Sequence, residues 1–426
     1  MFRPRQLLQG ALLLVGTSQV SFAQRTPSEF FDQYGFNPSK LSSFYSSLDG
    51  LSKRPVDVLF LGDSLSRGYG LADPDTQAWP NQMGRSLQSR WNPPGIEGGR
   101  GFLPARYTWA AQQQPFWVTG GYPTQWQKYM QATGNAVLRL NGSLNSPLYL
   151  RWDGSEITSL EVIAYRMTQV ASESDWVLFN DDQQFAGKIV TSRPTPPEIA
   201  RRTVLGKQRL DPQSTSRLSI RAPHTGYLRL SGIVRYRDDE NAGIRFQNLA
   251  CSGNLLADTS GFNSYLQNRE AGMVTPYTRD VFDANVTTFP HSKLVFLELG
   301  TNDQSTYGRT DLEAATLGHQ LFRRGLFEYC RMLTNRDNDV VLVVMPAPGA
   351  GRESRYRMMV PNAVAEVARI LPRVTRIDFD TAIGSVPRAF LPSGWDFGDQ
   401  VHLTRVAHDY FAQVTERLLV AGRLHH

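Results

Sequence analysis

Three residues of this chain combine the side-chain types that nucleophilic acyl transfer requires. Ser64 belongs to the segment Gly62–Leu65, which directly follows an apolar run, and Asp399 stands three positions before His402 near the C-terminus. A serine hydroxyl is a weak nucleophile until a neighbouring base takes its proton, and histidine can act as that base near neutral pH. A carboxylate fixes the tautomer of the histidine, and the three-residue spacing lets Asp399 and His402 share one tight loop. The pattern predicts a Ser–His–Asp triad with Ser64 as nucleophile.

Two further residues have the chemistry to bind a developing oxyanion. Asn302 and Gly253 each follow an apolar run of the kind that forms a buried strand. A side-chain amide and free main-chain N–H groups, such as that of Ser64, stabilise negative charge on a carbonyl oxygen. Taken singly, Asn302 also fits a helix cap, Gly253 a turn, and His402 a hydrogen-bonded core histidine. Their joint occurrence, each at a strand end or before the last helix, favours a single site.

The sequence leaves alternatives for the base and the acid of the triad. His408 is the nearest rival base, although it falls inside the last predicted helix, and the other histidines lack a carboxylate three residues earlier. Asp63 and Asp303 are alternative acids. Each stands beside a strand end, where an aspartate commonly serves turn hydrogen bonds.

The elements that must position these residues are five short apolar runs bounded by turn residues. Such runs are typical of strands buried on both faces of a parallel sheet. Helical patterns alternate with the later runs: a capping box at Thr310–Glu313 opens one helix, and apolar residues from Tyr410 to Leu418 line a face of the last one. This alternation predicts a doubly wound α/β sandwich with its site at the carboxyl edge of the sheet. The predicted strands are Val56–Leu61, Ile244–Leu249, Leu294–Leu299, Val340–Met345 and Val374–Phe379.

The long segment between the first two of these strands has a different pattern. Apolar and polar residues alternate in it over short stretches separated by turns. Period-two patterning with frequent turns is typical of an antiparallel β-sandwich or jelly roll. We therefore expect an inserted β-rich domain at residues 124–235, within a discontinuous α/β domain formed by residues 24–123 and 236–426.

The four motif blocks resemble those of the SGNH, or GDSL, hydrolases. The matching blocks are Gly62–Leu65, Gly253, Gly300–Asp303 and Asp399–His402. The resemblance implies a flavodoxin-like three-layer α/β/α sandwich with a five-stranded parallel sheet. It further implies that Ser64 attacks an acyl carbonyl, His402 takes its proton and Asp399 orients His402. The N–H groups of Ser64 and Gly253 and the side chain of Asn302 would form the oxyanion hole.

The overall arrangement also resembles exported carbohydrate O-acetylesterases that carry a β-sandwich after the nucleophile block. The segment Leu65–Gly68 differs from the histidine-bearing segment that follows the serine in the peptidoglycan enzymes of this group. The resemblance therefore implies an acetylated small molecule or polysaccharide as substrate without naming the glycan.

The N-terminus predicts export. Arg3 and Arg5 precede the short apolar stretch Leu7–Val15, and Ser21–Ala23 supplies small residues at positions that a signal peptidase reads. We expect cleavage after Ala23, a signal peptide at residues 1–23, a secreted or periplasmic protein, and no stable membrane insertion, because no later segment is apolar over ~20 residues.

The composition points to few other partners. A formal net charge of +6 comes without nucleic-acid-binding motifs or clustered basic runs, so we expect no nucleic acid partner. The histidines and carboxylates show no metal-ligand spacing, and we expect neither a metal nor a cofactor.

Several features keep two interpretations. Cys251 and Cys330 are either free buried thiols or a disulfide. The glycine-rich segment Gly98–Phe102 is a turn or a rim of the site. Four aromatic residues would stack on sugars or fill a domain interface: Trp109, Trp117, Tyr122 and Trp126.

The function that these observations predict is a secreted serine esterase that hydrolyses small acyl groups, chiefly O-acetyl, on a carbohydrate or cell-wall glycan. An O-acyltransferase that uses the same triad, and a lipase or broad carboxylesterase, remain alternatives. A catalytically dead glycan-binding protein is a third.

Overall fold

The structure, a computed structural model, describes most of the α/β part of the chain and the strands of the β-rich insert. Several predicted features lie outside the described residues: the signal peptide at residues 1–23, Gly253, Cys251, Trp109, Tyr122 and Thr310, together with the side chains of Trp117 and Trp126. Within the described part, no helix combines the length and apolarity needed to span a bilayer. The described residues are 26–104, 117–119, 126–129, 137–141, 148–151, 158–165, 176–179, 185–189, 200–203, 217–221, 227–250, 256, 286, 288–303, 312–346, 359–384, 394–399 and 401–426.

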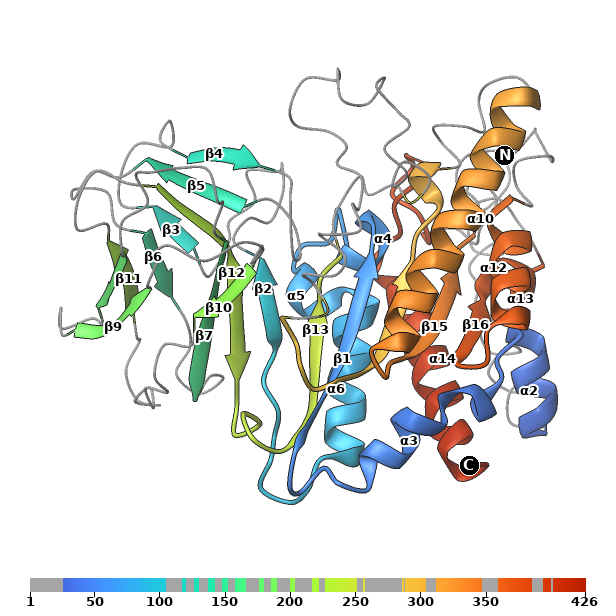
Figure 1. The fold of residues 1–426 in the computed structure, drawn as a ribbon, viewed down its shortest axis with the longest axis horizontal. Helices are drawn as coiled ribbons and strands as arrows, with labels where there is room; N and C mark the ends of the chain where they lie inside the picture. The colour runs from blue at the N-terminus through green and yellow to red at the C-terminus, as the bar shows by residue number, and fades with distance from the viewer. Residues whose placement is uncertain are drawn as a thin grey trace, which may run out of the picture.

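A parallel sheet of five strands forms the centre of the α/β part (Figure 1). Its strand order is β13-β1-β14-β15-β16, and every neighbouring pair is parallel. The predicted flavodoxin-like sheet is confirmed. Four predicted strands lie within one residue of the observed bounds, and the observed β14 begins two residues before its predicted start. The observed strands are β1 (Pro55–Gly62), β13 (Gly243–Asn248), β14 (Ser292–Glu298), β15 (Asp339–Val344) and β16 (Val374–Asp378).

Helices cover both faces of this sheet, because alternate residues of each strand face opposite sides. Leu59 and Leu61 of β1 pack into the core beneath α10 (Leu312–Asn335) and α12 (Met359–Ile370). Val58 and Phe60 pack into the second core, beneath the helices of the other face. The helices of that face are α2 (Pro27–Tyr34), α3 (Ser42–Leu48), α6 (Trp79–Trp91) and α14 (Arg405–Leu424). The α/β part also contains four short helical turns: η1 (Pro38–Leu41), α4 (Ser64–Arg67), α5 (Pro74–Gln77) and α13 (Phe379–Ala382).

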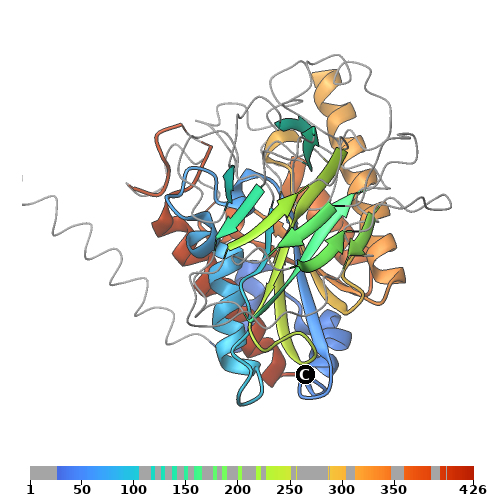
Figure 2. The same ribbon diagram turned by 90° about the vertical axis from the view of Figure 1, so that its left-hand side faces the viewer.

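Two antiparallel sheets form the insert, which lies beside the α/β part (Figures 1 and 2). One has the order β10-β7-β12-β5-β4, with β2 also pairing β12, and the other has the order β3-β6-β11-β8-β9. The strands are β2 (Gly101–Pro104), β3 (Trp117–Thr119), β4 (Trp126–Tyr129), β5 (Val137–Asn141), β6 (Leu148–Arg151), β7 (Ser159–Tyr165), β8 (Trp176–Phe179), β9 (Phe185–Ile189), β10 (Ala200–Thr203), β11 (Arg217–Arg221) and β12 (Tyr227–Tyr236). Thus β2 and β3, which precede residue 124, already pair with the strands of the antiparallel sheets.

The junction between the insert and the α/β part is held by a buried ion pair. Arg235 of β12 donates two hydrogen bonds to Asp75 of α5, at 2.8 and 2.6 Å, and both side chains are almost fully buried. Arg235 also donates to the carbonyl oxygens of Gly101 and Arg100, each at 3.2 Å. These four hydrogen bonds tie β12 to β2 and to the segment that follows Gly62–Leu65.

The glycine-rich segment Gly98–Phe102 serves this junction. Gly99 N–H donates to the carboxylate of Asp239 at 2.9 Å. At Gly101, where φ is +68°, a Cβ would lie 1.6 Å from the carbonyl oxygen of Phe246, so the backbone of β2 approaches β13 too closely for any other residue. Close strand packing accounts for these glycines.

Cys330 lies on α10 and is a free, fully buried thiol. Burial raises the pKa of this thiol well above its usual range, so it stays protonated and unreactive.

Candidate active site

The turn that carries Ser64 begins where β1 ends. At Gly62 a Cβ would lie 2.8 Å from Cβ of Ser66 and 3.0 Å from the carbonyl oxygen of Glu298, so the chain needs glycine to turn there. Asp63 caps α4 by accepting a hydrogen bond from the N–H of Leu65 at 2.9 Å. Ser64 is the first residue of α4, at the carboxyl edge of the sheet, and is 5% exposed.

A second layer of hydrogen bonds braces this turn, and the sequence patterns did not reveal it. Glu298, buried at the end of β14, accepts a hydrogen bond from the hydroxyl of Ser66 at 2.9 Å and one from the N–H of Asp63 at 3.4 Å. Asn248, at the end of β13, donates to the carbonyl oxygen of Ser66 at 2.9 Å. The ends of three adjacent strands therefore hold the backbone around Ser64.

The Asp399–His402 loop completes a hydrogen-bonded chain to Ser64. Nε2 of His402 lies 3.1 Å from Oγ of Ser64, and Nδ1 of His402 lies 2.6 Å from Oδ2 of Asp399. In the tautomer that carries its hydrogen on Nδ1, His402 donates a hydrogen bond to Asp399, and Nε2 is then able to accept one from the hydroxyl of Ser64. The structure thus brings together the three residues that the sequence selected for the triad.

The carboxylate of Asp399 also organises its own loop. Its Oδ1 accepts hydrogen bonds from the N–H groups of Val401, at 2.9 Å, and His402, at 2.8 Å. Burial alone raises the pKa of Asp399, but the hydrogen bonds from His402 and Val401 outweigh it and hold the pKa below its ordinary value of 3.8. Asp399 is therefore ionised at neutral pH, as a residue that orients a histidine must be.

Asn302 reaches the same edge of the sheet. It follows β14 in the helical turn Thr301–Asp303, and its Nδ2 lies 3.4 Å from Oδ2 of Asp63, beside Ser64. The third predicted oxyanion donor, Gly253, lies outside the described residues. Asp303 accepts hydrogen bonds from the N–H of Leu256, at 3.0 and 3.2 Å, and Asp63 is the cap of α4. Asp63 and Asp303 thus each accept hydrogen bonds from main-chain N–H groups, whereas Asp399 is the aspartate that contacts Nδ1 of His402.

His408, the rival base, is placed differently. It is 1% exposed on α14, and its Nδ1 accepts a hydrogen bond from the N–H of Trp79 at 3.2 Å. Burial lowers the pKa of His408 to about 3, so it is neutral across the physiological range. This histidine joins α14 to α6.

Two aromatic residues beside His402 were missed by the sequence reasoning. The ring of Tyr69 lies 4.3 Å from the imidazole of His402, centroid to centroid, at an interplanar angle of 37°. Phe397 packs over Gly70, where a Cβ would lie 2.7 Å from a ring carbon of Phe397. Tyr69 is 39% and Phe397 47% exposed. The sequence could have indicated these two aromatic residues only by their closeness to the triad along the chain. Tyr69 follows Ser64 by five residues, and Phe397 precedes His402 by five.

The described residues hold no group of three or more His, Cys, Asp or Glu side chains placed to bind a metal ion. The observed chemistry is that of a hydroxyl, an imidazole and a carboxylate in one hydrogen-bonded line.

In fold, this chain is structurally similar to the SGNH/GDSL esterases. A solved structure described as "Peptidoglycan O-acetylesterase in action, 5 min" matches 91% of this chain and 97% of its own, with a TM-score of 0.58 and 14% sequence identity. An acetyl xylan esterase (Est2A) from the rumen bacterium Butyrivibrio proteoclasticus matches 71% of this chain and 97% of its own, with a TM-score of 0.29 and 9% identity. A family two carbohydrate esterase from Cellvibrio japonicus matches 72% of this chain and 97% of its own, with a TM-score of 0.29 and 12% identity.

The shared fold rests on the first of these structures, because the TM-scores of the other two are low. No protein-family model matches the chain, and no curated protein sequence matches it.

Proposed function

We propose that this protein is an exported serine esterase that removes O-acetyl groups from a glycan, with Ser64 as nucleophile, His402 as base and Asp399 as the residue that orients the base. The observation that carries the proposal is the line of hydrogen bonds from Asp399 Oδ2 through the imidazole to Ser64 Oγ, at 2.6 and 3.1 Å. Ser64 is 5% exposed at the end of a buried strand, and its hydroxyl contacts a histidine that an ionised aspartate holds. This arrangement activates a serine as a nucleophile, and packing alone does not require it.

His402 takes up a proton and gives it back twice, once in each half of the reaction. His402 Nε2 takes the hydroxyl proton as Ser64 Oγ adds to the acetyl carbonyl carbon, and the sugar oxygen leaves with that proton when the tetrahedral intermediate collapses. Water then adds to the acetyl-serine, gives its proton to His402, and acetate leaves as Ser64 regains the proton. Asn302 supports the proposal as the donor at this edge that can bind the carbonyl oxygen in both tetrahedral intermediates.

The glycan part of the proposal has separate support. The structure with the shared fold is named a peptidoglycan O-acetylesterase, and this chain carries a β-rich insert beside its site. Acetylated peptidoglycan is therefore the first substrate to test, with acetylated xylan and a neutral aryl acetate beside it. Export is proposed from the N-terminal sequence, and N-terminal sequencing of the mature protein should begin at Gln24.

The test of the triad uses the mature protein and a serine-reactive fluorophosphonate probe. The wild type should release acetate and take up one probe molecule, and Ser64→Ala should do neither while it keeps the circular dichroism spectrum. Ser89→Ala, on the exposed end of α6, is the matched control and should behave as the wild type. Aryl acetate turnover by folded Ser64→Ala would overturn the mechanism. Transfer of acetyl to an added glycan in place of water would identify an acyltransferase that uses the same triad.

A further inference from the structure

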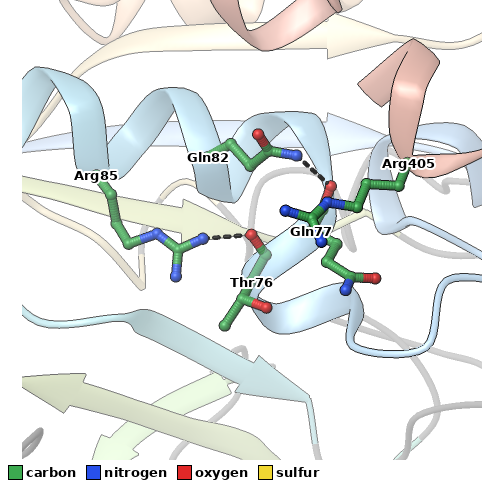
Figure 3. A pocket seen from close by; sticks show the side chains of 5 residues that line it. All are labelled: Thr76, Gln77, Gln82, Arg85 and Arg405. Atoms are coloured by element: carbon green, nitrogen blue, oxygen red, sulfur yellow. Dashed lines mark hydrogen bonds between the residues drawn. The ribbon is translucent and has the colours of Figure 1, made fainter. Parts of the chain in front are cut away.

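A polar pocket is lined by side chains of α5, α6 and α14, on one face of the α/β part (Figure 3). Its volume is about 430 Å³, within the range of small-molecule sites. Residues of three separate elements line it: Thr76 and Gln77 of α5, Gln82 and Arg85 of α6, and Arg405 of α14.

The charged lining of this pocket is entirely cationic. Arg85 is partly buried and donates to the main-chain oxygen of Thr76, and it forms no ion pair with a carboxylate in the described part of the chain. Burial lowers the pKa of Arg85 although Asp75 lies near enough to oppose the effect. The positive charge of Arg85 has lost part of its hydration without gaining a paired carboxylate. An anion that binds to it therefore adds a favourable interaction at a desolvation cost that folding has already partly met.

The second arginine stands at the rim. Arg405 is exposed, and its contact with Asp409 is long, at 3.7 Å. Asp409 also accepts a hydrogen bond from Nε2 of Gln82 at 2.7 Å, and the same Nε2 donates to the carbonyl oxygen of Gln77 at 2.6 Å. The nearest acid is therefore already engaged, and the amide of Gln82 is held in place. Figure 3 shows Arg405 directed toward Gln77 and Gln82.

The chain connects both walls of the pocket to the residues of the triad. Arg405 follows His402 by three residues, so their Cα atoms are at most about 11 Å apart. The wall formed by α5 is the next helical turn after α4, which begins at Ser64, and the buried ion pair of Asp75 with Arg235 fixes its position. The subsite proposed below requires that a substituent on the sugar that carries the ester, or on its neighbour, enters the pocket while the acetyl group is at Ser64.

We propose that this pocket is a subsite for an anionic group of the glycan, a carboxylate or a phosphate, next to the acetylated position. The proposal rests on the proposed esterase function. Guanidinium groups bind both oxyanions through paired, charge-assisted hydrogen bonds, and the side-chain amides and hydroxyl of the lining supply further polar contacts.

The first experiment measures kcat/KM for an acetylated glucuronate and for its neutral acetylated glucose analogue, and compares their ratio across variants. Arg405→Gln should lower this ratio roughly 10- to 100-fold, as expected for losing a hydrogen bond to a charged group, and Arg85→Gln should act in the same direction. Arg324→Gln is the matched control, because Arg324 is exposed on α10 and pairs only with Glu328 among the described residues. An unchanged ratio in Arg405→Gln, which removes an exposed side chain, would overturn the proposal even if Arg85→Gln fails to fold.

The second experiment separates the subsite from the catalytic proposal. Glucuronate, inorganic phosphate and glucose are titrated into the Ser64→Ala protein and followed by calorimetry. Glucuronate or phosphate should bind, more weakly in added salt, and the tighter of the two identifies the natural group. Binding of neither anion would overturn the subsite. If an anion binds Ser64→Ala while the wild type hydrolyses no ester, the subsite stands and the proposed function fails.

Discussion

Arg235→Met is the substitution that most directly tests how the insert is joined to the α/β part. Arg235 has no exposed side-chain surface and makes two hydrogen bonds to Asp75, whose side chain is 3% exposed. Methionine fills a similar volume, so the main change is the loss of one charge and of four hydrogen bonds, two of them to main-chain oxygens. Asp75 is then left with Arg100, whose nearest nitrogen is 3.4 Å away.

The expected cost follows from this geometry. Removing one partner of a buried pair typically costs 3–5 kcal/mol, because the other charge stays buried. Arg100 still offsets part of the charge of Asp75. We therefore expect Arg235→Met to lower the free energy of unfolding by about 3 kcal/mol. Arg235→Met combined with Asp75→Asn removes both charges, and this double variant should recover much of the loss, which gives a coupling energy of about 1–3 kcal/mol.

The assay is urea unfolding of the mature protein followed by tryptophan fluorescence and circular dichroism. Arg324→Met is the control, because it makes the same chemical change in an exposed pair whose side chains are 72% and 61% accessible, and it should cost at most about 0.5 kcal/mol. A loss in Arg235→Met no greater than in this control would refute the reasoning.

The pH dependence gives an independent check. Burial acts to raise the pKa of Asp75, but Arg235 outweighs it and holds the folded-state pKa below 3.8. A lowered carboxylate pKa stabilises the fold above the unfolded pKa, and this contribution is lost as pH falls through the folded one. In Arg235→Met the buried carboxylate is favoured in its protonated form. The difference in stability between wild type and variant should therefore be largest near neutral pH and shrink below pH 3.8.

Three further predictions concern the site and are measured by steady-state kinetics on an aryl acetate with circular dichroism as the folding control. Asn302→Ala should lower kcat roughly 10²–10³-fold with little change in KM, and a change confined to KM would assign Asn302 to substrate binding instead. Asp399→Asn should lower kcat by about 10⁴-fold, because Nδ1 of His402 loses the ionised acceptor that fixes its tautomer, and a loss below tenfold would contradict that role. Tyr69→Ala should lower kcat about two- to tenfold, because the ring face stabilises the imidazolium that forms at His402. Tyr69→Phe keeps the ring and should keep kcat, and equal losses in the two variants would assign the effect to the hydroxyl instead.

The parallel sheet and the triad are readable from sequence because their signals are local. The β-branched run Val56–Leu61 is buried on both faces, and such a run gives β1 to within one residue. Ser64 and Asn302 lie at the same edge of the sheet because each follows a parallel strand, and such strands end at one edge. His402 and Asp399 are three residues apart, so their pairing needs no knowledge of the fold.

The rest depends on contacts that no local pattern encodes. Asp75 and Arg235 are 160 residues apart, and each alone resembles an ordinary surface charge. The first strand of the insert is only four residues long, and its identity rests on the pairing of Gly101–Pro104 with Gly232–Arg235. Tyr69 acquires a role only through the position of the His402 ring. Sequence reasoning therefore selected the three residues that the structure joins by hydrogen bonds and missed the residues that surround them.

The strand register at the junction leads to a prediction about removing the insert. Pro104 of β2 and Gly232 of β12 are antiparallel partners, so a two-residue Asn-Gly turn can replace residues 105–231 and leave a short hairpin. We call this the hairpin variant. It keeps Arg235, its ion pair with Asp75 and its hydrogen bond to Gly101. A second deletion, at the expected boundaries 124–235, removes Arg235 and the strand that β2 pairs with, and leaves Asp75 buried without its main partner.

The two deletions should therefore differ in stability although they remove similar lengths of chain. The hairpin variant should be soluble, melt cooperatively and hydrolyse an aryl acetate, because the hydrogen bonds described above for Ser64, His402 and the turn around Ser64 are made within the α/β part. Its activity on an acetylated polysaccharide should fall strongly, since remote parts of a polymer contribute the binding energy that positions the reacting ester. The 124–235 deletion should aggregate or unfold at lower temperature. If the folded hairpin variant retains full activity on the polysaccharide, the insert takes no part in substrate binding. If the two deletion variants are equally stable, the ion pair between Arg235 and Asp75 does not hold the junction.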